Sequence, residues 1–164
     1  MSVSQTKELQ YQCVVDQFNE KGLERLGLMS SHTWVNDPKR LLFVLSRYKF
    51  VGKMLQGCDK VLEIGCADAF GTRIVAREVT DLTATDFDPV FIEDAKTRIS
   101  QPNHFECQVH DFIEAPFPGN FDAAFCLDVL EHISKENEIQ FLKNMVLSIS
   151  SKGVAIVGTP SFQS

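Results

Sequence analysis

Short apolar segments alternate with helical patterns from residue 61 onward, and this alternation constrains the fold more than any other feature of the sequence. Helical patterns are found at about 72–79 and 89–99, and a further helix follows Ser134. Short apolar strands joined by helices are typical of parallel sheets with helices on both faces. The sequence therefore predicts an α/β fold, a three-layer, doubly wound and mainly parallel sheet. The predicted strands are 61–64, 82–85, 105–109, 121–127 and 154–157.

The first 57 residues have a helical pattern without predicted strands. Residues 6–26 are predicted as one or two short amphipathic helices, and residues 30–36 as a loop. Asp37 followed by Pro38 predicts the start of a longer helix, because a side-chain acceptor before a proline is a common helix N-terminus. The apolar positions expected to be buried in the first helices are Leu9, Cys13, Phe18, Leu23 and Leu26.

Length, charge and cysteine content limit the possible functions. The 164 residues fit one domain, in which residues 1–57 are expected to pack on a core of residues 58–164. A formal net charge of −6 disfavours nucleic acid as a partner. The five cysteines include no C-x-x-C pair and the four histidines no ligand pair, so no metal is expected. A polar N-terminus and the lack of a long apolar run predict a cytoplasmic protein without a membrane span.

Carboxylates follow most of the predicted strands. Glu63 lies at the end of the first strand and Asp86 at the end of the second, while Asp111 and Asp128 follow the third and fourth. In a doubly wound sheet, ligands bind beyond the carboxyl ends of the strands, where the strand order reverses. These groups, together with Asp68, repel a polyphosphate but accept hydrogen bonds from amines and hydroxyl groups. A ligand with a cationic centre and hydroxyl groups is therefore expected at this edge.

The loop after the first strand argues against a dinucleotide. A G-x-G-x-x-G fingerprint that begins at Gly65 needs glycines at positions 67 and 70, where the sequence has Ala67 and Phe70. An NAD(P)-dependent oxidoreductase is therefore the least favoured of the functions considered.

Four motifs in order resemble those of class I (Rossmann-like) S-adenosylmethionine-dependent methyltransferases. The run VLEIGCADAFGT is similar to that family's first motif, E/D-x-G-x-G-x-G. Asp86 in LTATDFD lies 21 residues beyond Gly65, matching the family's acidic residue after the second strand, and HDFIEAPFP resembles its third-strand segment. FDAAFCLDVLEHI resembles the fourth-strand motif of the small-molecule branch, which includes ubiquinone-type methyltransferases. The resemblance covers about residues 60–160 and implies a transferase that methylates a small-molecule acceptor.

The same resemblance implies S-adenosylmethionine as the cofactor and S-adenosylhomocysteine as its product. Glu63 and the loop backbone are assigned to the methionine part, and Asp86 to the ribose hydroxyl groups. Asp111 is assigned to the adenine amine, Phe87 to the ring face and the Phe112 backbone N–H to a ring nitrogen. The residues implied in cofactor binding are Glu63, Gly65, Cys66, Ala67, Asp86, Phe87, Asp111, Phe112, Leu127 and Asp128.

Two further expectations concern the conformation of the first-motif loop and the identity of a general base. Ala67 and Ala69 replace the second and third glycines of the first motif, and alanine disfavours the positive φ that such a turn uses. His132 is the candidate general base, with Glu131 or Asp128 to orient it, because histidine titrates near neutral pH. A solvated helical turn is the alternative interpretation of Glu131 and His132.

Other residues near the site also have more than one interpretation. Arg47 and Tyr48, on the preceding helix, are expected to reach a cofactor carboxylate. Asp111 fits the cap of a turn as well as it fits a binding site. Cys66 and Cys126 are interpreted as small core residues rather than as nucleophiles.

The last predicted strand, 154–157, leaves an apolar edge on the sheet. The family fold normally continues with a helix and antiparallel strands, so this core is expected to lack its C-terminal strands. Proteins usually avoid exposed apolar edge strands. We therefore expect a truncated sequence, or a homodimer or partner chain that covers the edge. The alternative function is a cofactor-binding but catalytically inactive subunit or regulatory module.

Overall fold

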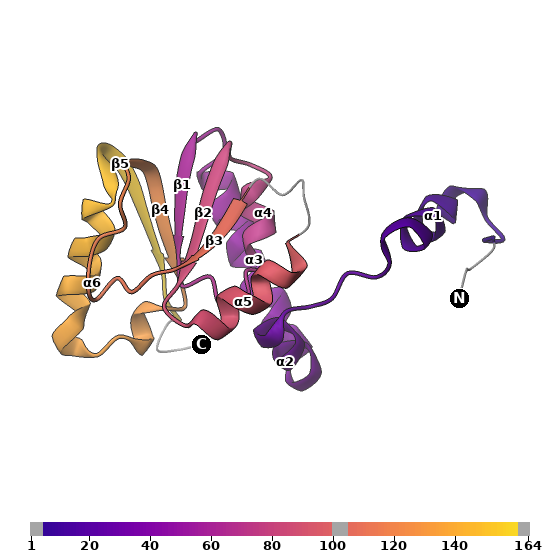
Figure 1. Ribbon diagram of the computed structural model, residues 1–164, viewed down its shortest axis with the longest axis horizontal. Helices are drawn as coiled ribbons and strands as arrows, with labels where there is room; N and C mark the ends of the chain where they lie inside the picture. Colours follow the sequence, from indigo (N-terminus) through magenta and orange to yellow (C-terminus); the bar gives the residue numbers. More distant parts are fainter. Residues whose placement is uncertain (1–4, 100–104, 161–164) are drawn as a thin grey trace.

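The structure, a computed structural model, describes residues 5–99 and 105–160. Within these residues, five parallel strands form one sheet in the order β3–β2–β1–β4–β5 (Figure 1). The chain runs outward from β1 to β3 and returns to β4 on the other side of β1, so the strand order reverses between β1 and β4. All five predicted strands are confirmed. They are β1 (Lys60–Ile64), β2 (Asp81–Asp86), β3 (Phe105–Val109), β4 (Phe121–Leu127) and β5 (Ile149–Gly158).

Helices cover both faces of the sheet, which confirms the three-layer α/β prediction (Figure 1). Helices α3, α4 and α5 contribute buried side chains to one face, and α6 to the other. In the part of the chain that the structure describes, no helix has the length and apolar character needed to cross a bilayer. The helices are α1 (Gln12–Lys21), α2 (Leu28–Asn36), α3 (Pro38–Met54), α4 (Thr72–Ala76), α5 (Pro89–Arg98) and α6 (Lys135–Leu147), with 3₁₀ turns η1 (Leu9–Tyr11) and η2 (Leu130–His132).

The sheet separates two apolar cores. Val51 of α3 belongs to the same cluster of buried side chains as Val61 of β1. On the opposite face, Phe141 and Met145 of α6 belong to a cluster with Leu62. Val61 and Leu62 enter different cores because successive side chains of a strand point to opposite faces. Full burial of such a side chain contributes roughly 1.5–3 kcal/mol, and both cores fix the strand ends that carry the site.

Two helices begin where a local signal marks their start. The side chain of Asp37 accepts a hydrogen bond from Arg40 N over 3.2 Å, and Asp88 Oδ1 accepts one from Val90 N over 2.9 Å. Proline is the first residue of both α3 and α5, a position where the missing N–H has no helical partner to lose.

Helix α2 was not expected from the sequence. Residues 30–36, predicted as a loop, lie within α2. The residue at its N-cap is Gly27, which has no side chain to mark a helix start. Its first N–H groups are instead bound by carboxylates far along the chain, described below, so no local pattern announces this helix.

The predicted burial of the first helices is wrong. Leu9, Cys13 and Leu23 are exposed, Phe18 and Leu26 are only half-buried, and α1 has no buried residue. Figure 1 shows α1 well away from the sheet. An amphipathic pattern identifies the helix, but it does not determine whether the rest of the chain covers its apolar side.

Strand β5 forms an edge of the sheet. Within the described residues it pairs only with β4, and its other edge lacks a strand partner. Val154 is 51% exposed and Val157 is 40% exposed. The expected apolar edge is therefore present.

Candidate functional site

Acidic side chains gather at the carboxyl ends of the strands. Glu63 is in β1, Asp86 ends β2 and Asp128 directly follows β4. Strand β1 pairs with both β2 and β4, so these three residues lie at the carboxyl ends of adjacent strands. The strand order reverses between β1 and β4, and doubly wound sheets bind ligands at such a reversal. This edge is the candidate site.

Glu63 is the most deeply buried of these acids. Its Oε1 accepts a hydrogen bond from Tyr48 Oη of α3 over 2.8 Å. Among the described residues, Glu63 Oε2 and Thr72 Oγ1 are buried without a hydrogen bond of normal length, and the Thr72 hydroxyl lies near enough to Glu63 to act on its pKa. Burial raises the pKa of Glu63 to about 7, against the lowering effect of the Thr72 and Tyr48 hydroxyl groups. Burial, reinforced by Glu63, also raises the pKa of Tyr48 well above its usual value. A buried carboxyl with an unused oxygen fits a ligand that brings a hydrogen-bond donor.

The loop after β1 has a left-handed backbone at three positions. The φ angles are +76° at Gly65, +46° at Ala67 and +53° at Ala69. A side chain has no room at Gly65, because a Cβ there would overlap Val129. Left-handed conformation costs a residue with a Cβ roughly 1–2 kcal/mol. The two alanines therefore adopt the positive φ expected of the glycine motif they replace, at a cost in stability.

Asp86 joins the end of β2 to this loop. Its Oδ2 accepts a hydrogen bond from Ala67 N over 2.8 Å, and its Oδ1 accepts one from Asp88 N over 2.9 Å. Burial raises the pKa of Asp86, although these backbone donors act in the opposite direction. A carboxylate has about four acceptor positions, so the structural role of Asp86 leaves positions for the hydroxyl groups of a ligand.

The three residues assigned to the adenine of the cofactor lie in different environments. Phe87 is 70% exposed, so its ring is accessible to a ligand. Asp111 is half-buried, and its Oδ1 accepts a hydrogen bond from Ile113 N over 2.8 Å, so it caps a turn. The Phe112 side chain is buried in the core, 6.2 Å from Phe141 between ring centroids. Only the backbone of Phe112 remains a candidate for ligand contact.

Arg47 and Asp128 form an ion pair between α3 and the end of β4. The guanidinium carbon of Arg47 also lies 4.6 Å from the ring centroid of Phe43. Asp128 has a φ of +55°, a third non-glycine residue in the left-handed region. Sequence reasoning assigned Arg47 to a cofactor carboxylate and did not pair it with Asp128. Any bound carboxylate has to share Arg47 with this aspartate.

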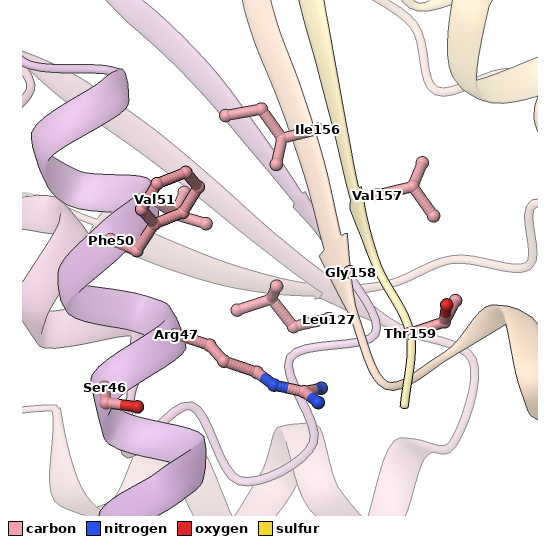
Figure 2. Close-up of a pocket in the computed structure, with 9 residues that line it drawn as sticks. All are labelled: Ser46, Arg47, Phe50, Val51, Leu127, Ile156, Val157, Gly158 and Thr159. Atoms are coloured by element: carbon pink, nitrogen blue, oxygen red, sulfur yellow. The ribbon is translucent and has the colours of Figure 1, made fainter. Parts of the chain in front are cut away.

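A cavity of about 300 Å³ lies beside this ion pair (Figure 2). Its walls include Phe50 and Val51 of α3, Leu127 of β4 and Ile156 of β5, with Arg47 also lining it. Figure 2 shows the Arg47 side chain extending from α3 toward the end of β4 below Leu127. A mainly apolar cavity with one cationic group fits a small molecule that has an apolar body.

Glu131 and His132 lie in η2 and are both exposed. The backbone N–H of His132 donates to Val129 O over 2.9 Å, which closes a 3₁₀ turn rather than a regular helical turn. An exposed imidazole is surrounded by water unless a bound substrate covers it. The catalytic role of these two residues therefore stays a prediction.

The buried cysteines beside the site are poor nucleophiles. The thiol of Cys107 and burial raise the pKa of Cys66 well above its usual value, and burial raises the pKa of Cys126 to about 12. A protonated thiol is unreactive compared with a thiolate. These properties support the interpretation of Cys66 and Cys126 as core residues.

Comparison with known proteins identifies the family. A family model described as a methyltransferase domain matches residues 61–153, more than half of the chain. The chain belongs to the methyltransferase domain family. The matched range contains nearly all of β1, all of β2 to β4 and α6, and the cofactor-binding residues implied from Glu63 to Asp128, but not Arg47 or Tyr48 of α3.

Two curated relatives of this methyltransferase domain share a name. A ubiquinone biosynthesis O-methyltransferase of Rickettsia canadensis (strain McKiel) is 27% identical over 157 residues, which cover 86% of this chain and 63% of the relative. The enzyme of that name from Xanthomonas campestris pv. campestris (strain B100) is 25% identical over 129 residues, covering 71% of this chain and 52% of the relative. The chain thus spans between about half and two thirds of the length of these relatives.

A solved structure supports the fold. The N-methyltransferase NodS from Bradyrhizobium japonicum WM9, in complex with S-adenosyl-L-homocysteine, matches with a TM-score of 0.64 and 22% identity. The match covers 78% of this chain and 70% of that one. At this identity the likeness concerns the fold alone.

Sequence reasoning assigned one residue of the first motif to the wrong surroundings. Asp68 was placed among the carboxylates of the ligand crevice, but its side chain accepts a hydrogen bond from Ser30 N of α2 over 2.6 Å. No signal in the sequence connects residues 38 positions apart, because the contact depends on how α2 docks against the loop.

Proposed function

We propose that this methyltransferase domain transfers a methyl group from S-adenosylmethionine to a small-molecule acceptor. The observation that carries the proposal is the buried carboxyl of Glu63, whose Oε2 has no partner in the described part of the chain, at the strand-order reversal. S-adenosylmethionine brings an ammonium group, two ribose hydroxyl groups and an adenine amine, all of which donate hydrogen bonds. This donor set fits an edge whose side chains are acceptors.

In this proposal, the cofactor lies across the carboxyl ends of β1, β2 and β3. Glu63 accepts from its ammonium group, and Asp86 accepts from its ribose hydroxyl groups. Phe87 lies against the adenine, and Asp111 with the Phe112 backbone binds its edge. The bound cofactor supplies a methyl group on a sulfonium, which is a good leaving group.

The chain's own residues then have to align the acceptor and exclude water. The cavity lined by Phe50, Leu127 and Ile156 is the proposed acceptor site, since it adjoins Arg47 at the end of β4. Its apolar walls and the names of the curated relatives support an acceptor hydroxyl on an apolar body. His132 is the proposed base that removes the hydroxyl proton, with Glu131 or Asp128 to orient it.

Isothermal titration with S-adenosylhomocysteine tests the cofactor assignment. We expect micromolar binding, about −8 kcal/mol, that is lost in Asp86→Ala. The matched control is Asp122→Ala: Asp122 Oδ2 accepts a hydrogen bond from Lys60 N over 2.9 Å, at the opposite end of the sheet. The control should bind like the wild type. Titration with NADH, a polyanion, should give no heat of binding.

Absence of binding by the folded wild-type chain would overturn the proposal. Tight binding without turnover toward any apolar acceptor that carries a hydroxyl group would instead indicate a cofactor-binding module without catalysis.

A further inference from the structure

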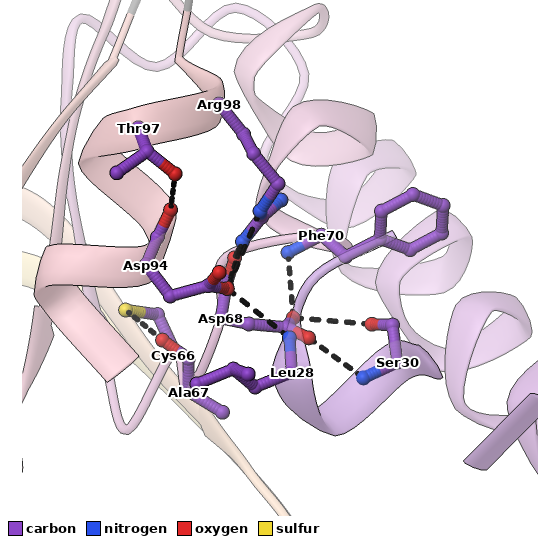
Figure 3. A network of polar contacts seen from close by, with 9 residues as sticks. All are labelled: Leu28, Ser30, Cys66, Ala67, Asp68, Phe70, Asp94, Thr97 and Arg98. Atoms are coloured by element: carbon purple, nitrogen blue, oxygen red, sulfur yellow. Dashed lines mark hydrogen bonds and ion pairs between the residues drawn. The ribbon is translucent and has the colours of Figure 1, made fainter. Parts of the chain in front are cut away.

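Asp68 lies between the two left-handed alanines of the loop after β1, but its side chain points away from the ligand site. It is 3% exposed. Asp68 Oδ2 accepts from Ser30 N over 2.6 Å, and Oδ1 accepts from Ser30 Oγ over 3.1 Å. Oδ1 also accepts from Phe70 N, two residues farther along the same loop, over 3.1 Å. One carboxylate thus connects the loop to the N-terminus of α2 (Figure 3).

Helix α2 has no N-terminal cap of its own, because its N-cap residue is Gly27. Two distant carboxylates take that role. Asp68 binds the third N–H of the helix, and Asp94 Oδ2 of α5 accepts from the first, Leu28 N, over 3.1 Å. A side chain at position 27 would overlap Asp68. Helix α2 is therefore fitted closely against the loop.

Arg98 of α5 completes the connection from the other side. It donates to the backbone oxygen of Asp68 over 2.5 Å and to Asp94 Oδ2 over 2.9 Å. Its side chain is only 9% exposed. Figure 3 shows Asp94, Arg98 and Asp68 converging between α5 and the start of α2. Charge-assisted hydrogen bonds of this kind are about twice as strong as neutral ones.

The network acts where the backbone is strained. Ala67 and Ala69, with φ of +46° and +53°, are the direct neighbours of Asp68. Glycine would adopt these angles freely, whereas alanine has to be held in them. The carboxylate of Asp68 and the contact of Arg98 with its carbonyl oxygen supply that restraint from both sides.

We propose that Asp68 is a positioning residue of the cofactor site, which holds the alanine-substituted loop in its left-handed conformation by using the N-terminus of α2 as its donor. The inference rests on the proposed function, because the loop is the segment assigned to the methionine part of S-adenosylmethionine. It follows that cofactor affinity depends on the docking of α2, and that cofactor binding in turn stabilises this docking.

The test compares Asp68→Asn in two backgrounds of the full chain. In the wild-type background, we expect S-adenosylhomocysteine to bind about tenfold more weakly, which is about 1.4 kcal/mol. In an Ala67→Gly/Ala69→Gly background, the same change should cost less than about threefold, because glycine needs no restraint. This difference is a double-mutant cycle between Asp68 and its neighbours, measured by isothermal titration.

Asp37→Asn is the matched control. Asp37 also caps a helix, since its side chain accepts from Arg40 N over 3.2 Å, but it is exposed, it lies at the C-terminal end of α2, and its side chain makes none of the contacts of this network. It should lower the melting temperature without changing the dissociation constant. A purely structural role of Asp68 predicts the same pattern for Asp68→Asn.

Hydrogen exchange provides a second readout. Bound S-adenosylhomocysteine should slow exchange at Leu28 N and Ser30 N in the wild type and not in Asp68→Asn. If Asp68→Asn does not fold, Ser30→Ala replaces it, because this variant removes only the hydroxyl donor to Asp68. Ser30→Ala should weaken binding about threefold in the wild-type background, which has Ala67 and Ala69, and leave it unchanged in the Ala67→Gly/Ala69→Gly background.

The outcomes separate this inference from the proposed function. Equal losses in both backgrounds, or no loss in either, overturn the positioning role while the wild type still binds. A folded wild type that does not bind S-adenosylhomocysteine overturns the proposed function and this inference with it.

Discussion

The phenol of Tyr48 donates a hydrogen bond to Glu63 Oε1 over 2.8 Å, between two side chains that are both buried. The other oxygen of Glu63 lacks a partner among the described residues, and burial raises the pKa of this carboxyl to about 7. In the unliganded protein, burial therefore favours the protonated form of Glu63 as the pH falls below neutral. A ligand ammonium in this place favours the ionised form.

Binding of S-adenosylhomocysteine should therefore tighten as the pH rises from 5.5 to 7.5, by roughly 25-fold. The reason is that below pH 7 the ligand has to displace a proton from Glu63. Isothermal titration in buffers of different ionisation enthalpy measures this proton release directly. Glu63→Gln cannot release the proton, so its affinity should be weaker and much less dependent on pH. An identical pH profile in Glu63→Gln would assign the titration to Asp86, whose pKa burial also raises.

Stability without ligand should change with pH in the opposite sense. The pKa of Glu63 is about 7 in the folded state against an ordinary value of 4.5. The folded state therefore holds a proton that the unfolded chain releases, and the free energy of unfolding falls as pH rises from about 4.5 to 7. The loss is on the order of 3 kcal/mol. Urea unfolding at several pH values measures it, and Glu63→Gln should remove most of this slope.

Ala67→Gly should stabilise the unliganded protein by about 1 kcal/mol. Relief of the left-handed conformation at φ +46° outweighs the greater backbone entropy that glycine has in the unfolded chain. Thermal unfolding measures the change. Ala95→Gly in helix α5 is the control and should destabilise by at least about 1 kcal/mol, because Ala95 is in a regular helix. A lower melting temperature for Ala67→Gly would mean that the loop is not strained there.

Much of the fold follows from local patterns. Apolar runs predict each strand, and Asp37 and Asp88 mark helix starts because their acceptors lie next to the N–H groups that they cap. Helix α2 escapes prediction for the converse reason. The groups that cap it, Asp68 and Asp94, are 38 and 66 residues away from their donors.

The candidate site divides in the same way. The carboxylates at the strand ends follow from motif and topology, since the carboxyl ends of parallel strands meet at one edge. Arg47 and Asp128 are 81 residues apart, and their pairing depends on how α3 packs on the sheet. The positive φ of Ala69 follows from the motif. Most of the hydrogen bonds of Asp68 that hold the loop in this conformation come from residues far away in the sequence, so they cannot be read from the motif.

His132→Ala should lower kcat by about 100-fold or more at pH 7, because the His132 imidazole is the proposed base that accepts the hydroxyl proton of the methyl acceptor. The dissociation constant of S-adenosylhomocysteine should stay the same, because His132 lies in the exposed turn η2, after the residues assigned to the cofactor. Turnover is measured as S-adenosylhomocysteine formed with a panel of apolar acceptors that carry a hydroxyl group. His32→Ala, an exposed histidine on α2, is the control. Unchanged turnover in His132→Ala would remove this residue from the mechanism.

The outer edge of β5 should make this chain self-associate. Its backbone groups lack a strand partner in the described residues, and Val154 and Val157 stand half-exposed along it. An apolar edge strand tends to pair with another strand unless charges block it, and the one charged residue of β5, Lys152, precedes the apolar segment 154–157. Sedimentation velocity should show association that grows with protein concentration, and Val154→Lys should weaken it at least about tenfold, ~1.4 kcal/mol. Val35→Lys adds the same charge on the exposed side of α2 and should leave association unchanged. Equal association in both variants would mean that the contact between copies lies elsewhere, and a monomer at all concentrations would mean that the β5 edge does not pair with a second copy.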